Sequence, residues 1–341
     1  MLALVKERRA PGAVLKDVDV PEPGPYEVLA KVRATSICGT DAHIYFWNKW
    51  AASVSTPPKI MGHEFAAQIV QVGKSVVHLK KGDMISGETH IYCGTCVQCL
   101  AGNRHLCENM RLRGVDTDGC FAEYVVVSSN TAWKNDPSIP PIVASVQEPL
   151  GNAVHSVFSG EVTGRSILVL GCGPIGLCAI ELCKSAGAAK VIAVDISEYR
   201  LNMADKMGAD VVINGEKENT RQRVSEILPH GADVVLEMSG SGKALNDGLK
   251  VVKHGGRVTL LGLPAGRVSL DLSNDVITKG ITLQGIFGRK IFSTWELASR
   301  LMKNRSVNLN KIITHKLHLK DYKKAFELIS EGKCGKIVMT V

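Results

Sequence analysis

The sequence predicts an α/β protein made of a β-rich first domain and a second domain with a doubly wound parallel sheet. The chain has 341 residues, which is long for a single hydrophobic core and therefore indicates two domains. Short apolar runs separated by Gly and Pro turns fill residues 1–150, which is typical of barrel-like β domains. From residue 166 onward, short apolar runs alternate with helical patterns, which indicates a parallel sheet covered by helices on both faces.

The β-rich domain is expected to start with the first residues of the chain. Residues 27–34 alternate apolar and polar side chains with period two, and the segment Pro21-Glu22-Pro23-Gly24-Pro25 before them is a strong breaker. Helical patterns are scarce before residue 140. We expect strands at residues 2–5, 27–34, 65–72, 84–87 and 121–127.

The doubly wound domain is expected to follow a connecting helix at residues 152–159. Its strands are expected at 167–170, 191–195, 211–213, 234–238, 257–261 and 282–286, and its helices at 175–186, 198–207, 221–227 and 243–252. Helical patterns at 295–303 and 322–330 then precede a strand at 336–341, which we expect to return to the first domain. The predicted divisions are therefore 1–150, 151–290 and a C-terminal segment, 291–341.

Charge and hydrophobicity narrow the possible partners. The net charge is +8, but basic and acidic residues are interspersed, so we expect neither a nucleic-acid nor a membrane partner. No apolar run reaches membrane-spanning length, and the first residues lack the order of a signal peptide. A cytoplasmic location is the expectation that follows.

Four of the ten cysteines form the strongest local motif, Cys93-x-x-Cys96-x-x-Cys99-x7-Cys107. Four thiolates at these spacings can enclose one tetrahedral zinc and leave no open position, so the site would be structural. An iron–sulfur cluster is the alternative that the spacing leaves open.

A second group of metal-binding side chains lies earlier, in Cys38-Gly39-Thr40-Asp41-Ala42-His43 and Gly62-His63-Glu64. Three protein ligands with an open position would make a catalytic zinc site. Thr40 and His43 could pass a proton from an alcohol to solvent. The alternative is a buried structural cysteine with two ordinary turn histidines.

The third motif is the glycine-rich segment Gly171-Cys172-Gly173-Pro174-Ile175-Gly176, which follows an expected strand and opens an expected helix. This is the context in which such glycines hold a dinucleotide pyrophosphate at a helix N-terminus. Asp195 ends the next strand, 19 residues after Gly176, and would accept hydrogen bonds from a ribose and repel a 2′-phosphate. Asp195 favours NAD, whereas Arg200 could be used to argue for NADP. A nicotinamide cofactor beside a single-metal site indicates that the metal polarises an alcohol, which then transfers hydride.

From end to end, the chain resembles the zinc-dependent medium-chain dehydrogenases. The resemblance rests on the three motifs above and on further segments that begin at Gly119, Gly151, Glu237, His254 and Ile313. It implies a GroES-like catalytic domain with a structural zinc lobe at 93–107, a Rossmann NAD-binding domain, two zinc ions per chain and a homotetramer. The strand at 282–286 would be a pairing edge between subunits.

The resemblance also implies roles for single residues. Cys38, His63 and Glu64 match the catalytic-zinc positions, and Glu148 matches an acidic position tied to the metal and to proton transfer. Thr40 and His43 match the relay that carries the hydroxyl proton past the nicotinamide ribose. The positions that match NAD contacts are Gly171, Gly173, Ile175, Gly176, Asp195, Arg200, Leu261, Gly262, Leu263, Ile286 and Phe287.

The substrate follows from the segments that vary within this family. The aromatic loop after His43, the segment Gly151-Asn152-Ala153-Val154-His155, and Glu237-Met238-Ser239-Gly240 are similar to the branch that oxidises the 3-hydroxyl of L-threonine to L-2-amino-3-oxobutanoate. Phe46, Asn48 and Glu148-Pro149-Leu150 are closer to polyol dehydrogenases, so a polyol or vicinal-diol substrate of the sorbitol or butanediol type is the alternative. A non-catalytic NAD-binding protein, with zinc only in the four-cysteine lobe, is the alternative of another class.

Overall fold

The computed structural model describes residues 1–341, which form two compact units. The first unit comprises Met1–Pro149, Lys290–Lys303 and Ile313–Val341, and the second comprises Leu150–Arg289 and Asn304–Ile312. Residues 304–312, which the sequence analysis assigned to the C-terminal segment, thus lie with the second unit. No helix combines the length and the apolar character needed to cross a membrane.

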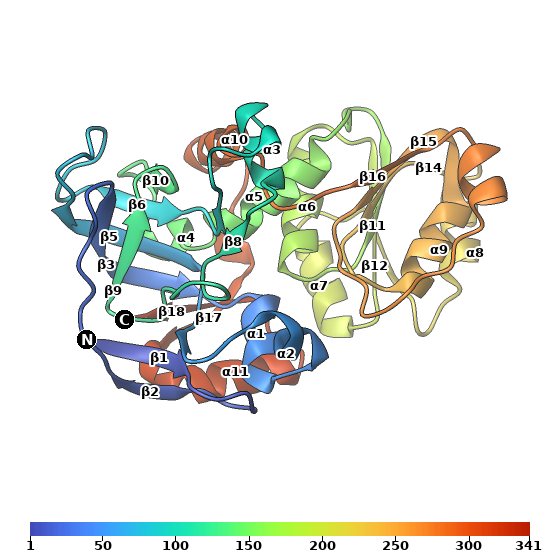
Figure 1. Ribbon diagram of the computed structural model, residues 1–341. Helices are drawn as coiled ribbons and strands as arrows, with labels where there is room; N and C mark the ends of the chain where they lie inside the picture. The colour runs from blue at the N-terminus through green and yellow to red at the C-terminus, as the bar shows by residue number, and fades with distance from the viewer. The chain divides into compact units, whose positions relative to one another are not determined.

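The first unit is rich in short strands (Figure 1). Its seven-stranded sheet runs in the order β10-β6-β5-β3-β18-β17, with β9 also paired to β3. Strands β2-β1-β4 form a three-stranded sheet, and β7 pairs with β8. The bounds are β1 (Leu2–Lys6), β2 (Val14–Asp17), β3 (Glu27–Ser36), β4 (Lys59–Ile60), β5 (Glu64–Val72), β6 (Met84–Gly87), β7 (His90–Ile91), β8 (Arg111–Leu112), β9 (Tyr124–Ser128), β10 (Ala132–Lys134), β17 (Ile313–His318) and β18 (Lys336–Thr340).

Two helices of the first unit position candidate site residues. Ile44 of α1 is buried in the core, and Tyr45 stacks on Phe326 of α11 with ring centroids 4.0 Å apart. This packing fixes α1 against α11 in the hydrophobic core of the first unit. The helices are α1 (Gly39–Phe46), α2 (Lys49–Val54), α3 (Val97–Leu100), α4 (Pro141–Ala144), α10 (Ser293–Lys303) and α11 (Tyr322–Ser330).

The second unit is a six-stranded parallel sheet in the order β13-β12-β11-β14-β15-β16. This is the strand order of a dinucleotide-binding fold, so the predicted fold class is confirmed. Figure 1 shows α6 and α7 on one face of the sheet and α8 and α9 on the other. The bounds are β11 (Ser166–Leu170), β12 (Lys190–Asp195), β13 (Val211–Asn214), β14 (Ala232–Glu237), β15 (Val252–Leu260), β16 (Thr282–Gly285), α6 (Pro174–Ser185), α7 (Glu198–Lys206), α8 (Thr220–Ile227) and α9 (Gly242–Val251).

Three expected elements begin at least three residues from their expected starts. The strand expected at 257–261 is β15, which begins five residues earlier, at Val252. The strand expected at 121–127 begins at Tyr124, because the Phe121 N–H donates to the Met61 carbonyl instead of joining that ladder. The connecting helix is α5 (Gln147–Val157), which starts five residues before its expected start at residue 152. Pro149 is tolerated because it lies in the first turn, where its missing N–H has no partner to lose. Glu148 therefore lies in the first turn of α5.

Asp233 joins three neighbouring strands of the parallel sheet. Its carboxylate accepts hydrogen bonds from the Ser166 N–H (2.8 Å), from the Ser166 hydroxyl (2.6 Å) and from the Lys253 ammonium. Partial burial acts to raise the pKa of Asp233, but the hydrogen bonds from Lys253 and Ser166 hold this pKa at about 2.

Replacement of Asp233 by Asn should lower the free energy of unfolding by about 1–2 kcal/mol near neutral pH, because charge-assisted hydrogen bonds are lost. The pKa is lower in the folded than in the unfolded state, so the wild-type advantage is present above about pH 4 and is lost as the pH falls towards 2. Urea unfolding of both proteins from neutral pH down to about pH 3 checks this. The matched control is Asp205→Asn, on an exposed position of α7. A wild-type advantage that does not change with pH would contradict the assignment.

Candidate active site and metal centres

Strand pairing brings three candidate zinc ligands together in the first unit. Cys38 follows β3 and precedes α1, while His63 immediately precedes β5 and Glu64 is its first residue. Because β3 and β5 are antiparallel neighbours with Ser36 opposite Glu64, the sulfur, nitrogen and oxygen donors lie within 4.8 Å of one another. Their roles as ligands stay predictions.

Gly62 allows this approach. It has φ +90°, and a Cβ atom there would meet the Phe121 ring at 2.1 Å. Any other residue would have to displace a core aromatic side chain. The glycine before His63 is therefore required for packing.

The environment of His63 fits a metal cation. Its Nδ1 lies 3.4 Å from Asp41 Oδ1, and neither atom has a hydrogen-bond partner. Burial acts to lower the pKa of His63, but the negative charge of Asp41 and Cys38 raises this pKa well above its usual 6.5. A buried imidazole that attracts positive charge, beside a thiol and a carboxylate, has the donor chemistry of a zinc site.

Glu64 is held by a buried cation that the sequence analysis missed. Lys336, at the start of β18, donates from Nζ to Glu64 Oε1 (2.6 Å) and to the Ile37 carbonyl (2.9 Å). The Ser36 hydroxyl donates to the other carboxylate oxygen. Burial acts to lower the pKa of Lys336, but the Glu64 carboxylate raises it, so the lysine is charged. Glu64 therefore sits in a fixed ion pair at the metal group.

Glu148 belongs to the same buried neighbourhood. Thr89 donates from its hydroxyl to Glu148 Oε1 at 2.5 Å, and the Glu148 charge contributes, after that of Glu64, to raising the pKa of Lys336. Nearby in sequence, Glu88 Oε1 accepts from His90 Nδ1 (2.8 Å). His90 is thus a buried, oriented residue.

The two candidate relay residues lie on α1. Thr40 is half-buried in the first turn, and His43 is exposed one turn later. His43 Nδ1 lies 2.8 Å from Asn48 Nδ2, and the Trp50 ring meets the His43 ring edge-on at 5.9 Å. Trp50 also packs against the core of the first unit.

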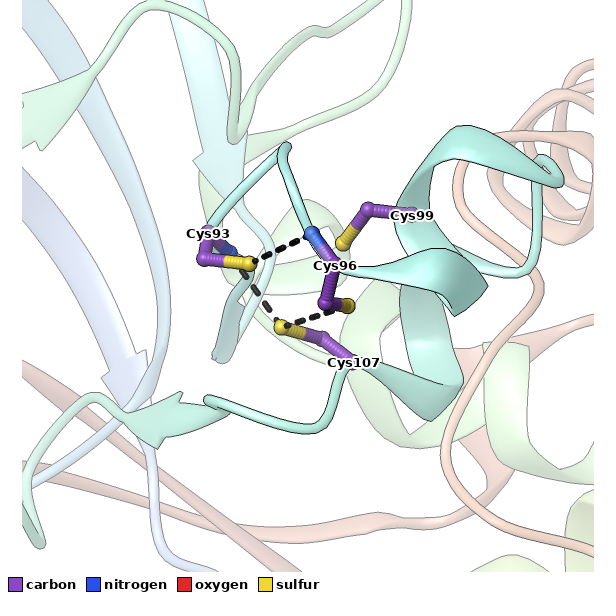
Figure 2. A group of neighbouring side chains, drawn as sticks. All are labelled: Cys93, Cys96, Cys99 and Cys107. Carbon is purple, nitrogen blue, oxygen red and sulfur yellow. Dashed lines mark hydrogen bonds between the residues drawn. The ribbon is translucent and has the colours of Figure 1, made fainter.

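The four cysteines of the lobe gather around one point, and Figure 2 shows their sulfur atoms facing one another. Cys93 Sγ accepts from the backbone N–H groups of Thr95 (3.4 Å) and Cys96 (3.3 Å). These bonds, together with that from the Thr95 hydroxyl, lower the pKa of Cys93 to about 5, whereas burial raises the pKa of Cys99 to about 12. The sulfur-only donor set with a closed geometry fits a structural zinc.

The candidate cofactor site lies in the second unit, where β11 leads into α6. Gly171 has φ +96°, and a Cβ at Gly176 would meet the Gly171 carbonyl oxygen at 2.0 Å, so both glycines are required. Gly173 caps α6 without a side-chain bond, which leaves the helix N-terminus available for phosphate. A cavity of about 600 Å³ lies beside this turn, and its lining includes Gly171, Gly173, Asp195 and Arg200 together with Lys243 and Asp247 of α9.

Asp195 is fixed at the end of β12. Its carboxylate accepts from the backbone N–H groups of Cys172 (2.7 Å) and Ser197 (2.9 Å), and Arg200 lies 3.9 Å away. Of the other predicted cofactor contacts, Leu261, Gly262 and Leu263 follow β15, and Ile286 and Phe287 follow β16. Leu263 and Phe287 are exposed, whereas Ile286 is buried and Ile175 is half-buried in α6.

The residues missed from the sequence differ in whether a signal existed. Lys336 and Thr89 act through partners distant in sequence, so no local pattern marks them. The capping role of Asn48 could have been recognised, because Asn is a usual N-cap residue and α2 begins at the next residue, Lys49.

Models of known protein families match both parts of the chain. The family described as "Alcohol dehydrogenase GroES-like domain" matches residues 24–139, and "Zinc-binding dehydrogenase" matches residues 174–304. Among solved structures, a zinc-binding dehydrogenase from Sinorhizobium meliloti bound to NADP has a TM-score of 0.92 at 28% identity, covering 100% of this chain and 99% of that one. The 2R,3R-butanediol dehydrogenase of Bacillus subtilis has a TM-score of 0.90 at 27% identity, with coverage of 100% and 99%.

Curated relatives are more similar in sequence. The L-threonine 3-dehydrogenase of Caldanaerobacter subterraneus subsp. tengcongensis is 50% identical over 341 residues, covering 99% of this chain and 98% of the relative. The L-threonine 3-dehydrogenase of Pyrococcus abyssi is 51% identical over 340 residues, with the same coverage. The chain therefore belongs to the zinc-dependent medium-chain dehydrogenases, in the family of the L-threonine 3-dehydrogenases.

Proposed function

We propose that this protein oxidises the 3-hydroxyl of L-threonine to L-2-amino-3-oxobutanoate and reduces NAD⁺ to NADH. The observation that carries the proposal is the near-complete alignment, at about half identity, with several enzymes named L-threonine 3-dehydrogenase. In this reaction the C3 hydrogen leaves as hydride to the nicotinamide, and the hydroxyl hydrogen leaves as a proton. The protein has to activate the hydroxyl, accept its proton and hold the cofactor.

The first of these tasks needs a metal, which Cys38, His63 and Glu64 would hold. A zinc ion bound there would supply Lewis acidity that lowers the pKa of the substrate hydroxyl. A second zinc in the lobe of Cys93, Cys96, Cys99 and Cys107 would be structural, giving two per chain. Membership of a zinc-dependent family favours zinc over an iron–sulfur cluster in that lobe.

Proton removal is the task we assign to the residues of α1 and α5. Thr40 offers a hydroxyl that can accept one proton while it donates its own, and His43 is exposed, so it can exchange protons with water. The buried carboxylate of Glu148, held by the Thr89 hydroxyl, adds negative charge beside the metal group and favours positive charge there.

Replacement of Thr40 by Ala should lower turnover by roughly a hundredfold or more, because the hydroxyl that hands on the proton is removed. The affinity for NAD and the zinc content should stay nearly unchanged. Steady-state kinetics with a cofactor titration checks both expectations, and Thr40→Ser, which keeps a hydroxyl, is the matched control. Unchanged turnover in the Ala variant would rule out the relay.

Asp195 supports NAD as the cofactor rather than NADP. Its carboxylate is held at the sheet end by two backbone N–H groups, so a negative charge faces the cavity where the adenosine ribose would bind. Arg200 lies close enough to offset part of that charge, which is the argument for NADP. The fixed carboxylate outweighs the half-exposed guanidinium, whose charge water screens more strongly.

Replacement of Asp195 by Ala should weaken NAD binding and shift the ratio of kcat/KM for NAD over NADP by about tenfold or more towards NADP. The reason is that both a ribose hydrogen-bond acceptor and a repulsive charge are lost. Kinetics with each cofactor measures the ratio. A preference that does not move would count against the ribose role.

The substrate is tested by NADH formation on zinc-replete protein with L-threonine, sorbitol and 2,3-butanediol. Preference for L-threonine supports the proposal. Preference for a diol would support the second candidate, which the structural similarity to a butanediol dehydrogenase keeps open. A protein with only one zinc and no activity would be the non-catalytic relative. The homotetramer and the cytoplasmic location stay predictions.

A further inference from the structure

The turn between α1 and α2 places one amide side chain against the candidate relay histidine. The Asn48 side chain makes two contacts: Oδ1 accepts from the Ala51 N–H at 2.9 Å, and Nδ2 lies 2.8 Å from His43 Nδ1. The Asn48 backbone N–H also donates to the His43 carbonyl at 3.2 Å. Asn48 therefore links the last turn of α1 to the first turn of α2.

The helix cap determines which way the amide faces. Asn48 is the N-cap of α2, with extended backbone angles, and its Oδ1 satisfies a backbone N–H that has no partner inside the helix. A reversed amide would set two donors against each other and lose the cap, at a cost of about 1 kcal/mol. Nδ2 must therefore face the imidazole.

An amide nitrogen only donates, so His43 Nδ1 must accept. A neutral imidazole with an acceptor at Nδ1 carries its hydrogen on Nε2. The cap of α2 thus specifies the tautomer of a side chain on α1.

Other contacts keep the turn in this geometry. Lys6 is buried and donates from Nζ to the carbonyls of Gly12 (2.8 Å) and Tyr45 (3.1 Å), and Nζ lies 4.9 Å from the Trp47 ring centroid. Trp47 adopts the left-handed conformation, φ +56°, and its N–H donates to the His43 carbonyl. The backbone on both sides of Asn48 is consequently fixed.

We propose that Asn48 is a positioning residue that holds His43 in the tautomer with its hydrogen on Nε2. The proposal deepens the function above, since it rests on His43 being the relay histidine. In this tautomer the Nδ1 lone pair accepts from the Asn48 amide, so the exposed imidazole presents an N–H at Nε2. Asn48 thereby determines which ring nitrogen of the relay histidine carries the hydrogen.

The test is the tautomer itself, read by ¹⁵N NMR of labelled, zinc-replete protein without substrate, at a pH where the histidines are neutral. His43→Gln serves only to assign the His43 signals. We expect a hydrogen-bearing Nε2 and a bare Nδ1 in the wild type. A bare Nε2, or an equal mixture, would overturn the proposal, and this spectrum decides even if a variant fails to fold.

Asn48→Asp is the matched variant. Its carboxylate can still cap α2, but it only accepts, so His43 should move its hydrogen to Nδ1 while the thermal midpoint stays close to that of the wild type. A tautomer that does not change in Asn48→Asp would also overturn the proposal. Because no substrate is present, these results are independent of the NADH assay that tests the function.

Discussion

Replacement of Cys38 by Ser is expected to lower the zinc content from two ions per chain to about one, and turnover with L-threonine by roughly a thousandfold or more. A serine hydroxyl is a poor replacement for a thiolate at a zinc site, and the remaining donors, His63 and Glu64, are two rather than three. The thermal midpoint should change little, since Cys38 is half-buried and lies outside the hydrophobic core. Metal analysis and NADH formation measure the two effects.

Cys93→Ser is the matched control, because it also removes one sulfur and one expected zinc. The lobe around Cys93 is made of the two-residue strands β7 and β8 and the four-residue helix α3, which have few internal backbone bonds. Loss of zinc from the lobe in Cys93→Ser should therefore lower the thermal midpoint of the protein strongly, as is usual for structural zinc sites. If both variants kept two zincs, or if Cys38→Ser kept full turnover, the assignment of the two sites would be wrong.

The second unit was the easier part to predict from sequence. Its buried parallel strands read as continuous apolar runs, and β11 and β12 begin one residue before the expected starts at 167 and 191. Glycines with required conformations, such as Gly171, mark where the strands end. In the first unit, β4, β7 and β8 have two residues each, too few for any periodicity to show.

Helix α1 was missed for a different reason. Its N-cap is Cys38 rather than a usual capping residue, although Asp41 completes a capping box by accepting from the Cys38 N–H at 2.8 Å. The sequence presented Cys38, Thr40 and His43 as a chemical motif, and the helix that spaces them was not visible. The motif residues could be named from the sequence. Lys336, which orients Glu64, depends on a contact between segments far apart in the sequence, whereas Asn48 contacts a histidine only five residues before it.

Replacement of Lys336 by Met is the second change with a large expected effect. It leaves the Glu64 carboxylate fully buried without its cation, and breaking a buried ion pair in this way typically costs about 3–5 kcal/mol. Lys324→Met, at an exposed position of α11, is the matched control and should change the urea midpoint little. The double variant Glu64→Gln/Lys336→Met should recover much of the loss, since no unpaired charge remains. A Lys336→Met midpoint equal to that of the wild type would show that the pair is not needed.

The same variant also reports whether Glu64 is close enough to touch the metal. A zinc ion held by Cys38 and His63 would itself provide positive charge to the Glu64 carboxylate and so offset the missing ammonium. The destabilisation by Lys336→Met should therefore be larger in the Cys38→Ser background, where this zinc is absent and the lobe zinc is kept, than in the wild-type background. Equal destabilisation in the two backgrounds would mean that zinc and Glu64 do not interact, and Glu64 would then be a buried partner of Lys336 and Ser36 rather than a zinc ligand.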